Sequence, residues 1–578
     1  MTFAGTTPEF SVREIPFSHH GSWFGVSPVV AENRYADDLH LVSHQTGMHA
    51  VLRFTPEAGG SRVETEVTAS PALLGWAYQG SVVQLAYETV DTLRLVGDGH
   101  GLGLRISAAD PVLSPFSGPY FYRDPVDGSY IYTLYQTGRR YRITVLSGTP
   151  ADVFGLEALG TSERGLVLPG GQPWEIAIEE FDSARPRYRG GAAFSQITHA
   201  AGERFAAFVE RIAPWRTAET PAAELAAYVL WSATVRPAGF LSRPGVLMSK
   251  HWMDKVWSWD HCFNAIALAA GAPDLAWSQF KIPFDHQDET GALPDSVTHS
   301  EVLYNFVKPP IHGWALRHLR DRLPEPLSPA ELTETYEQLA AWSQFWLTAR
   351  RVPGQQLPHY QHGNDSGWDN ATTFDAERLV QSADLAAFLV LQLTQLASLA
   401  EELHRPEEAA EWTRTADTVR SALLKELWHD GRFSPRGAAT GATARSTSLL
   451  DLMPIALGAD LPDDVRATLA AGIEAHLTPH GLATEQPSSP HYQADGYWRG
   501  PIWAPATVLI EDGLRRAGHT DLADEIGTRF RALCEKSGFA ENFDALTGTG
   551  LRDRAYTWTA SSYLIFAAAH EQRRSALL

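Results

Sequence analysis

Short runs in which apolar and polar residues alternate fill the first third of the chain. Alternation with a period of two is typical of β-strands that bury one face. Turn signals such as Asp98-Gly99 and Asp127-Gly128 separate the runs, and many short strands punctuated in this way indicate two packed antiparallel sheets. We predict a β-sandwich domain over residues 1–194, with strands at residues 51–54, 63–67, 82–87, 92–96, 130–135 and 141–145.

From about residue 195 the apolar positions recur at three- and four-residue spacing, which is the period of an amphipathic helix. The first expected helix covers residues 197–212, and Pro214 ends it. Residues 195–219 are therefore predicted to be a helical linker. The other helices are predicted at residues 222–235, 260–270, 273–286, 310–322, 329–351, 381–404, 406–428, 447–457, 463–477, 505–517, 522–537 and 557–572.

About a dozen helices after residue 220 fit six helical hairpins closed into a ring. No short-period repeat is visible, which disfavours an open solenoid. The loops alternate between brief ones and long ones rich in Trp, Gly and Asp. We predict a multidomain protein with an N-terminal β-sandwich followed by an all-α (α/α)6 barrel over residues 220–578, whose long loops gather at one end and form a pocket.

The composition is that of an ordinary globular protein, because 44% of the 578 residues are hydrophobic and 20% are charged. A net charge of −21 disfavours nucleic acid or an anionic membrane as partner and fits a polar small substrate. The two cysteines, Cys262 and Cys534, imply no disulfide framework. Eighteen tryptophans, many in expected loops, indicate stacking surfaces for a ligand as well as core packing.

The first residues, MTFAGT, contain no basic segment followed by an apolar run, so we expect no signal peptide. No apolar stretch is judged long enough to span a bilayer. These two observations predict a cytoplasmic protein without a membrane partner.

The stretch at residues 363–370, GNDSGWDN, is too rich in Gly, Asn, Asp and Ser to be a helix interior. It therefore predicts a sharp loop that carries an indole, Trp368, beside a carboxyl group, Asp369. A ring that packs on a sugar face and an acid that protonates a glycosidic oxygen suit carbohydrate chemistry. An ordinary polar loop between helices is the alternative, and the stretch alone does not exclude it.

Four further loop-like clusters combine aromatic and polar residues. Asp260, which ends the first cluster, is either a helix N-cap or a group that accepts hydrogen bonds from sugar hydroxyls. Alone, the others also have ordinary structural explanations: a solvated helix end, a structural histidine at His312, and a stacked Trp-Arg pair. The clusters lie at residues 250–260, 284–295, 308–314, and 497–503 together with 540–544.

Several other chemistries are poorly supported. The chain has no HxxxH motif, no cysteine pairs and no spaced acidic calcium loop, so neither a metal nor another cofactor is predicted. No serine stands in a Gly-x-Ser-x-Gly elbow, and no Gly-rich phosphate-binding loop is present. Carboxylates and aromatic rings remain as the candidate chemistry.

Taken together and in order, these clusters resemble the α/α-barrel glycoside hydrolases of family 63, with more distant similarity to trehalases. The resemblance spans about residues 220–570. The β-rich first third of the chain fits the N-terminal sandwich that many relatives carry, although its own sequence matches only weakly. The segments that carry it are WSWDHCF at 257–263, KPPIHGW at 308–314, DSGWDN at 365–370, YWRGPIW at 497–503, ENFDALTG at 541–548 and YTWT at 556–559.

The resemblance implies an inverting hydrolase of α-glycosidic bonds. The family's general acid lies in the Ser-Gly-x-Asp-Asn segment, which assigns that role to Asp369, and its general base lies in the Glu-Asn-aromatic segment, which assigns it to Glu541. Relatives often have Glu where this chain has Asp365, and the Arg-Trp pair common after the acid is absent here. The residues implied to bind the sugar are Trp259, Asp260, Gln287, His312, Gly313, Trp368, Arg499, Gly500, Trp503 and Trp558.

The leading prediction is an exo-acting α-glucosidase that acts on α-linked oligosaccharides or small glucosides. An α-mannoside or glycosylglycerate hydrolase is the alternative on the same scaffold, although known glycerate-type relatives usually lack a β domain. A non-catalytic carbohydrate-binding protein is the alternative from another class, and the presence of both carboxyl groups speaks against it. A phosphorolytic enzyme would not need the base Glu541.

Overall fold

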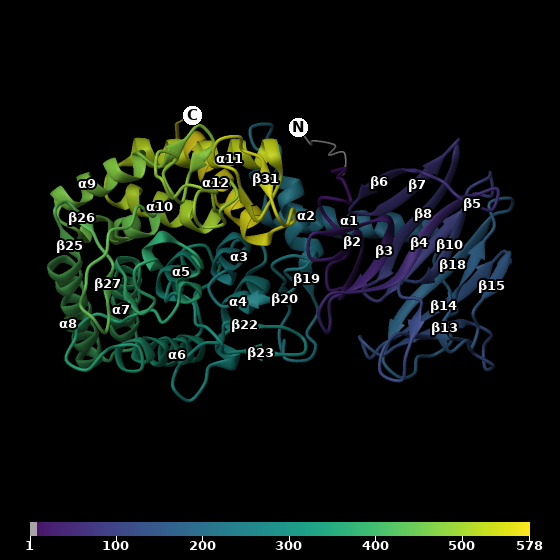
Figure 1. Cartoon of the computed structure of the whole chain (residues 1–578), viewed down its shortest axis with the longest axis horizontal. Coiled ribbons are helices and arrows are strands. Elements are labelled where there is room, and N and C mark those ends of the chain that lie inside the picture. The colour runs from purple at the N-terminus through teal and green to yellow at the C-terminus, as the bar shows by residue number, and fades with distance from the viewer. Residues whose placement is uncertain (1–7, 578) are drawn as a thin grey trace.

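The computed structural model describes residues 8–577 and divides into a β-rich half and a helical half that lie side by side (Figure 1). The β-rich half comes first in the chain. The predicted order of a β-rich region followed by a helical domain is therefore confirmed.

The β-rich half is a sandwich of two antiparallel eight-stranded sheets. The strands of the first sheet, in spatial order, are β1 (Phe17–Ser18), β2 (Phe24–Ala31), β3 (Arg34–Ser43), β4 (His49–Ala58), β10 (Gly103–Ala108), β17 (Gly165–Leu168) and β15 (Asp152–Phe154), with β5 (Ser61–Arg62) paired to β4. The second sheet runs β12 (Pro119–Arg123), β13 (Tyr130–Leu134), β14 (Arg140–Ser147), β18 (Trp174–Phe181), β9 (Thr92–Gly97), β8 (Ser81–Thr89), β7 (Leu73–Tyr78) and β6 (Glu66–Ser70).

Alternation of side chains along the strands builds the core between the two sheets. Leu41 and Phe54 of the first sheet are buried in one cluster with Leu85 and Ile176 of the second. The inward residues therefore come from both sheets, as the period-two pattern predicts.

Helix α1 (Phe194–Ile212) joins the two halves and packs on β8 of the sandwich and on α2 (Ala223–Ala233) of the helical half. Its buried residues include Phe205, Phe208 and Val209. The division of the chain at residues 194 and 219 stays a prediction, although α1 occupies most of the predicted linker.

Six inner helical segments pack in a closed ring, each against the next and the last against the first. They alternate along the chain with six outer helices, which is the arrangement expected of six helical hairpins. The inner segments are α3 (His261–Leu268), α5 (His312–Arg320), α7 (Ala383–Glu402), the irregular helix η5 (Leu449–Asp460), α10 (Ala504–Arg516) and α12 (Thr557–Leu577). The outer helices are α2, α4 (Pro273–Lys281), α6 (Pro329–Thr348), α8 (Pro406–Ala422), α9 (Asp463–Glu474) and α11 (Thr520–Ser537).

Local sequence explains several helix ends. Pro273, Pro329 and Pro406 are the first residues of α4, α6 and α8, positions at which no intrahelical N–H bond is lost. Ser328 caps α6 through the backbone N–H of Glu331, whose side chain bonds back to the backbone of Ser328.

Helix α7 differs from the expectation that no stretch could span a bilayer. It has a mean hydropathy of 1.5 and is long and apolar enough to cross a membrane by length and composition. In the described chain, 78% of that stretch is buried inside the protein. Its apolar character is therefore explained by its position within the ring, where α5, α6, α8 and η5 contact it.

Gly313 provides a test of the ring packing. A Cβ atom at this position of α5 would lie 2.5 Å from the Cα atom of Gln392 in α7, so alanine forces the two inner helices apart. We expect Gly313→Ala to destabilise the protein by roughly 1–3 kcal/mol, measured by thermal or denaturant unfolding.

Gly202→Ala in α1 is the matched control, because the nearest atom to its added Cβ would be Ala72 Cβ at 3.7 Å. That helical substitution should be neutral or should stabilise by about 0.5–1 kcal/mol. A Gly313→Ala protein as stable as the wild type would contradict the close α5–α7 contact.

Candidate active site

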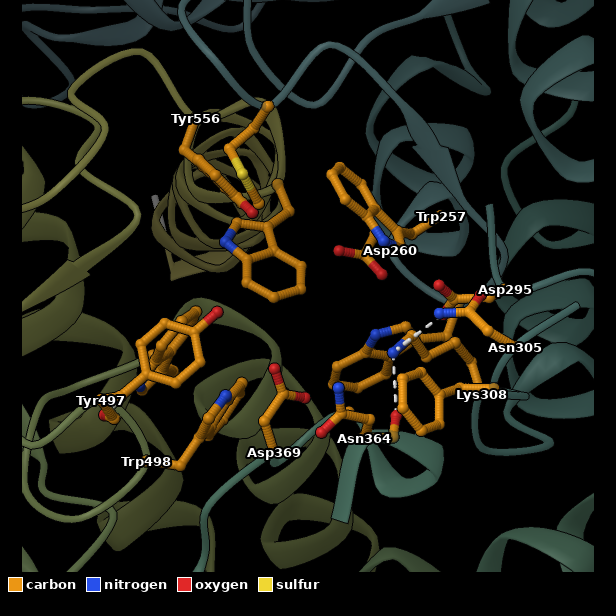
Figure 2. Close-up of a pocket in the computed structure, with 16 residues that line it drawn as sticks. Trp257, Asp260, Asp295, Asn305, Lys308, Asn364, Asp369, Tyr497, Trp498 and Tyr556 are labelled. Atoms are coloured by element: carbon orange, nitrogen blue, oxygen red, sulfur yellow. Dashed lines mark hydrogen bonds and ion pairs between the residues drawn. The ribbon is translucent and has the colours of Figure 1, made fainter. Parts of the chain in front are cut away.

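A pocket opens where the segments that precede the inner helices meet, and sixteen residues line it (Figure 2). Its free volume is about 170 Å³. Pockets for drug-sized ligands measure ~300–1,000 Å³, so this pocket fits a small ligand such as a single sugar ring. The pocket was found at the end of the barrel where the long loops were expected to gather.

Asp260 stands at the N-cap position of α3, but its side chain makes no capping hydrogen bond. Its Oδ2 atom is buried without a hydrogen-bond partner among the described residues. Burial raises the pKa of Asp260 to about 8, and the nearby carboxyl groups of Asp295 and Asp369 add to the effect. Of the two alternatives left by the sequence, this geometry favours a group that is free to bind a ligand.

Lys308 brings a positive charge into the pocket. Its ammonium group lies 3.0 Å from Asp295 Oδ1 and donates to the carbonyl oxygen of Asn364 at 2.8 Å (Figure 2). Burial disfavours the charge, but Asp295, Asp369 and Asp260 together outweigh it and raise the pKa of Lys308. An ammonium group has three N–H donors, so one remains for a ligand acceptor.

The loop at residues 363–370 is as tight as its composition predicts. Gly363 to Ser366 form one 3-10 turn, and Gly367 follows with a φ of +74°. A Cβ atom on Gly367 would lie 2.5 Å from the indole of Trp259. Glycine at 367 therefore permits both the left-handed backbone and the contact between this loop and Trp259.

The two acids of this loop have different environments. Asp365 is buried and accepts hydrogen bonds from Arg350 at 2.6 Å and from the backbone N–H groups of Gln361 and Val307, which makes it a structural anchor. Asp369 lines the pocket, and within residues 8–577 its carboxyl group makes no hydrogen bond to another residue's side chain. Burial, reinforced by the charge of Asp295, raises the pKa of Asp369.

Glu541 is not one of the residues that line the pocket, and it stands immediately before β30 (Asn542–Phe543). Its side chain is buried, and its backbone N–H donates to the carbonyl oxygen of Asp553 at 2.7 Å. Burial, followed by the charge of Asp553, raises the pKa of Glu541 to about 8. Arg552 and the hydroxyl of Tyr497 act in the opposite direction and favour the ionised form.

Tyr497 links the two candidate catalytic acids. It lines the pocket, and the charges of Glu541 and Asp369 both act on its phenol group. Burial and the charges of Glu541 and Asp369 raise its pKa well above the usual value. Its φ of +63° is unusual for a residue with a side chain, and strained backbone of this kind clusters at functional sites.

A ladder of tryptophans forms one side of the site. Trp498 stacks on Trp503 with ring centroids 3.9 Å apart and an angle of 7° between the ring planes. Trp368 also stacks on Trp498, with ring centroids 4.5 Å apart. Trp558 meets both Trp503 and Trp259 edge to face. Rigid aromatic surfaces of this kind are suited to packing on a sugar ring.

The structure brings some of the sequence-predicted site residues together and separates others. Those that line the pocket are Trp259, Asp260, Asp369, Trp503 and Trp558. Glu541 and Trp368 are not among the lining residues, and Trp368 is stacked on the lining residue Trp498.

Three residues predicted to bind the sugar have structural partners outside the pocket lining. Gln287 donates to the backbone carbonyls of Gly291 and Gln338. His312 donates through Nε2 to the carbonyl of Ser258 at 2.8 Å. Gly313 is needed for the α5–α7 contact described above.

Arg499 and Gly500 also lie outside the lining. Arg499 donates to the carbonyl oxygen of Asn370 at 2.7 Å and pairs with Asp375, so it holds the loop that carries Asp369 instead of facing the pocket. The backbone N–H of Gly500 donates to the hydroxyl of Thr484.

Several lining residues were not singled out by sequence reasoning: Met253, Trp257, Asp295, Asn305, Phe306, Lys308, Asn364, Gly367, Tyr497, Trp498 and Tyr556. All except Asn305 and Phe306 lie within the segments that the sequence had already marked. Membership of a marked segment was therefore the only sequence signal for these residues. Which residue of a segment faces the pocket depends on the backbone geometry.

Comparison with known proteins shows similarity to proteins named mannosylglycerate and glucosylglycerate hydrolases. Residues 253–559 match the profile of the mannosylglycerate hydrolase MGH1-like glycoside hydrolase domain. A mannosylglycerate hydrolase from Rubrobacter radiotolerans is 25% identical over 417 residues, which are 56% of this chain and 92% of that protein. A glucosylglycerate hydrolase from Mycolicibacterium hassiacum is 23% identical over 416 residues, which are 54% of this chain and 91% of that protein.

Among solved structures, a bacterial glucoamylase in complex with acarbose superposes with a TM-score of 0.64 at 12% identity. The superposition covers 99% of this chain and 96% of that one. The two-domain architecture as a whole is thus shared with that enzyme's fold, and the family profile covers more than half of the chain. The chain belongs to the MGH1-like glycoside hydrolases of family 63, which are related to trehalases, and it is a glycoside hydrolase.

Proposed function

We propose that the protein hydrolyses a small α-glycoside of the glycosylglycerate type with inversion at the anomeric carbon. Asp369 is the general acid and Glu541 the general base in this proposal. The observation that carries it is a pair of buried carboxyl groups, Asp369 in a pocket walled by tryptophan and Glu541 outside the lining, whose charges both act on the lining residue Tyr497. The non-catalytic alternative is set aside because the chain belongs to a hydrolase family and keeps both carboxyl groups.

The raised pKa of Asp369 suits a general acid, which must hold its proton until the glycosidic oxygen leaves. Glu541 must instead be ionised when it activates water. Because its pKa is raised to about 8, activity should increase with pH through the neutral range as Glu541 loses its proton. Inversion needs about 6.5–9.5 Å between the two carboxyl groups, which leaves room for the water molecule.

The named activities of the relatives support a glycosylglycerate as the substrate. The charge of the pocket lining is compatible with an anionic aglycone, although three aspartates belong to that lining. At neutral pH Asp260 is mostly protonated and Lys308 is charged, so the lining carries little net negative charge. Lys308 is the cation with an uncommitted N–H donor that could receive a carboxylate.

A neutral α-glucoside is the second candidate. The contact of the Lys308 ammonium group with Asp295 favours it, since that ion pair already compensates the positive charge. An exo-acting α-glucosidase would use the same acid, base and tryptophan wall.

The proposed roles are tested by Asp369→Asn and Glu541→Gln. Each variant should lose about 10²–10⁴-fold in kcat, because each lacks one proton-transfer group, while both should remain folded. The measurement is steady-state hydrolysis, together with NMR detection of the anomer formed in the first turnover, which should be inverted.

Asp375→Asn is the matched control for Asp369→Asn, because Asp375 follows in the same segment but pairs with Arg499 outside the pocket. It should retain kcat within a few-fold. Near-normal hydrolysis by either carboxyl variant, or retention of anomeric configuration, would contradict the assignment.

Replacement of Lys308 separates the two substrate candidates. A panel should contain glucosylglycerate, mannosylglycerate and neutral α-linked disaccharides. If the aglycone carboxylate binds the ammonium group, Lys308→Met should lower kcat/KM for the glycosylglycerate at least tenfold more than for a neutral glucoside. Lys255→Met, which removes an ion pair with Glu301 outside the pocket lining, should affect all substrates alike. Equal losses by Lys308→Met would favour the neutral substrate.

The raised pKa of Glu541 also predicts how stability depends on pH. The folded protein keeps this proton up to about pH 8, whereas the unfolded chain releases it near the ordinary glutamate pKa. Stability from this group is therefore present at low pH and is lost as pH rises through the folded pKa. Glu541→Gln removes this dependence. The melting temperature of the variant minus that of the wild type should therefore be several degrees larger at pH 8.5 than at pH 5.

Glu219→Gln, which changes an exposed glutamate, should show no such growth of the difference. A constant difference between Glu541→Gln and the wild type from pH 5 to 8.5 would show that burial does not hold the proton on Glu541.

A further inference from the structure

One wall of the pocket belongs to a segment that also contacts the β-sandwich. This segment, residues 249–257, is called the bridging segment below. Met253 and Trp257 line the pocket, and a turn within the segment is closed by hydrogen bonds from Ser249 N to Met253 O and from Met248 N to Lys255 O, both at 2.9 Å. The bridging segment therefore has a defined shape between two domains.

Two side chains of the bridging segment are held by the sandwich. The side-chain nitrogen of Lys250 donates to Ser18 Oγ at 3.0 Å and to the carbonyl oxygen of Ser22 at 2.7 Å. His44, the residue after β3, contacts Asp254 through Nδ1 at 3.2 Å, and both are buried. Polar groups in the interior are costly unless paired, so these contacts favour one position of the segment.

Two other side chains of the bridging segment contact Asp553, whose backbone is hydrogen-bonded to that of the proposed base. Ser249 Oγ donates to Asp553 Oδ1 at 2.9 Å, and His251 Nδ1 contacts the same oxygen at 3.1 Å. The carbonyl oxygen of Asp553 in turn accepts the backbone N–H of Glu541. A continuous set of buried contacts thus leads from the sandwich to Glu541.

We propose that His44 of the β-sandwich is a positioning residue for hydrolysis. Through Asp254 it fixes the bridging segment. The segment in turn holds Met253 and Trp257 in the pocket wall and Asp553 beside Glu541. The sandwich is then a working part of the active site and not only a cover for one barrel face. The expected loss of kcat/KM rests on the proposed function, whereas the expected change in hydrogen exchange of the bridging segment does not.

The decisive variant is His44→Leu, which removes the hydrogen bond and keeps an apolar group of moderate size. We expect faster hydrogen exchange at the amides of residues 248–257 and a tenfold or larger loss of kcat/KM, because small displacements of a site are costly to catalysis. His44→Asn, whose side-chain N–H can still reach Asp254, should restore most of both properties.

His40→Leu is the matched control. His40 is a buried histidine in β3 whose Nδ1 bonds to the carbonyl oxygen of Asp38 within the sandwich. It should lower the melting temperature without changing exchange in the bridging segment or the kinetic constants. If His44→Leu fails to fold, Asp254→Ala cuts the same contact from the helical side and is measured in its place.

Unchanged exchange in residues 248–257 would overturn the mechanical link, and faster exchange with unchanged kcat/KM would overturn the positioning role. A wild-type protein that hydrolyses no glycoside of the panel would refute the proposed function instead, and the exchange comparison would still decide whether His44 holds the segment.

Discussion

Desolvation of carboxyl groups is the physical constraint on which the site depends. Asp260, Asp369 and Glu541 are buried among aromatic rings, and each has a raised pKa for that reason first. An acid that stays protonated at neutral pH can donate its proton to a glycosidic oxygen. Burial hinders a general base, because it raises the pKa and so disfavours the ionised form that the base needs. Lys308 beside the first two, and Arg552 beside Glu541, oppose the desolvation. The positions of these two cations therefore limit how far burial raises the pKa of each acid.

The closed ring explains how residues from distant parts of the chain reach one pocket. The pocket residues Asp260, Lys308, Trp503 and Tyr556 stand at or just before the start of an inner helix, whereas Asp369 is in the longer connection that leads to α7. All six inner segments run in the same direction, because an outer helix returns the chain before each one, so their N-termini gather at one end. Helix N-termini favour negative charge, and they add to the two cations in making buried carboxylates tolerable there.

Much of this architecture could be predicted from sequence because it depends on local periodicity. The helices predicted at 329–351 and 381–404 correspond to α6 and α7 with ends shifted by a few residues. The tight loop of Asp369 was evident from its glycines. Orientation within the clusters was not, because it depends on tertiary contacts: His312 turns to the Ser258 carbonyl, while Lys308, four residues earlier, enters the pocket. Asn305 and Phe306 carried no sequence signal, since neither belongs to a patterned segment.

The match to the glycosylglycerate hydrolases leaves nearly half of this chain without a counterpart, which agrees with the expectation that glycerate-type relatives lack a β domain. The glycosylglycerate hydrolases match just over half of this chain, whereas the glucoamylase fold extends over nearly all of it. Overall architecture and substrate therefore need not vary together, because function lies in the site and not in the fold. In this molecule the segments before the inner helices carry the charges that would distinguish an anionic from a neutral aglycone. In the proposal for His44, the sandwich acts on the site only through the bridging segment, which supplies Met253 and Trp257 to the wall, because none of the lining residues belongs to the sandwich.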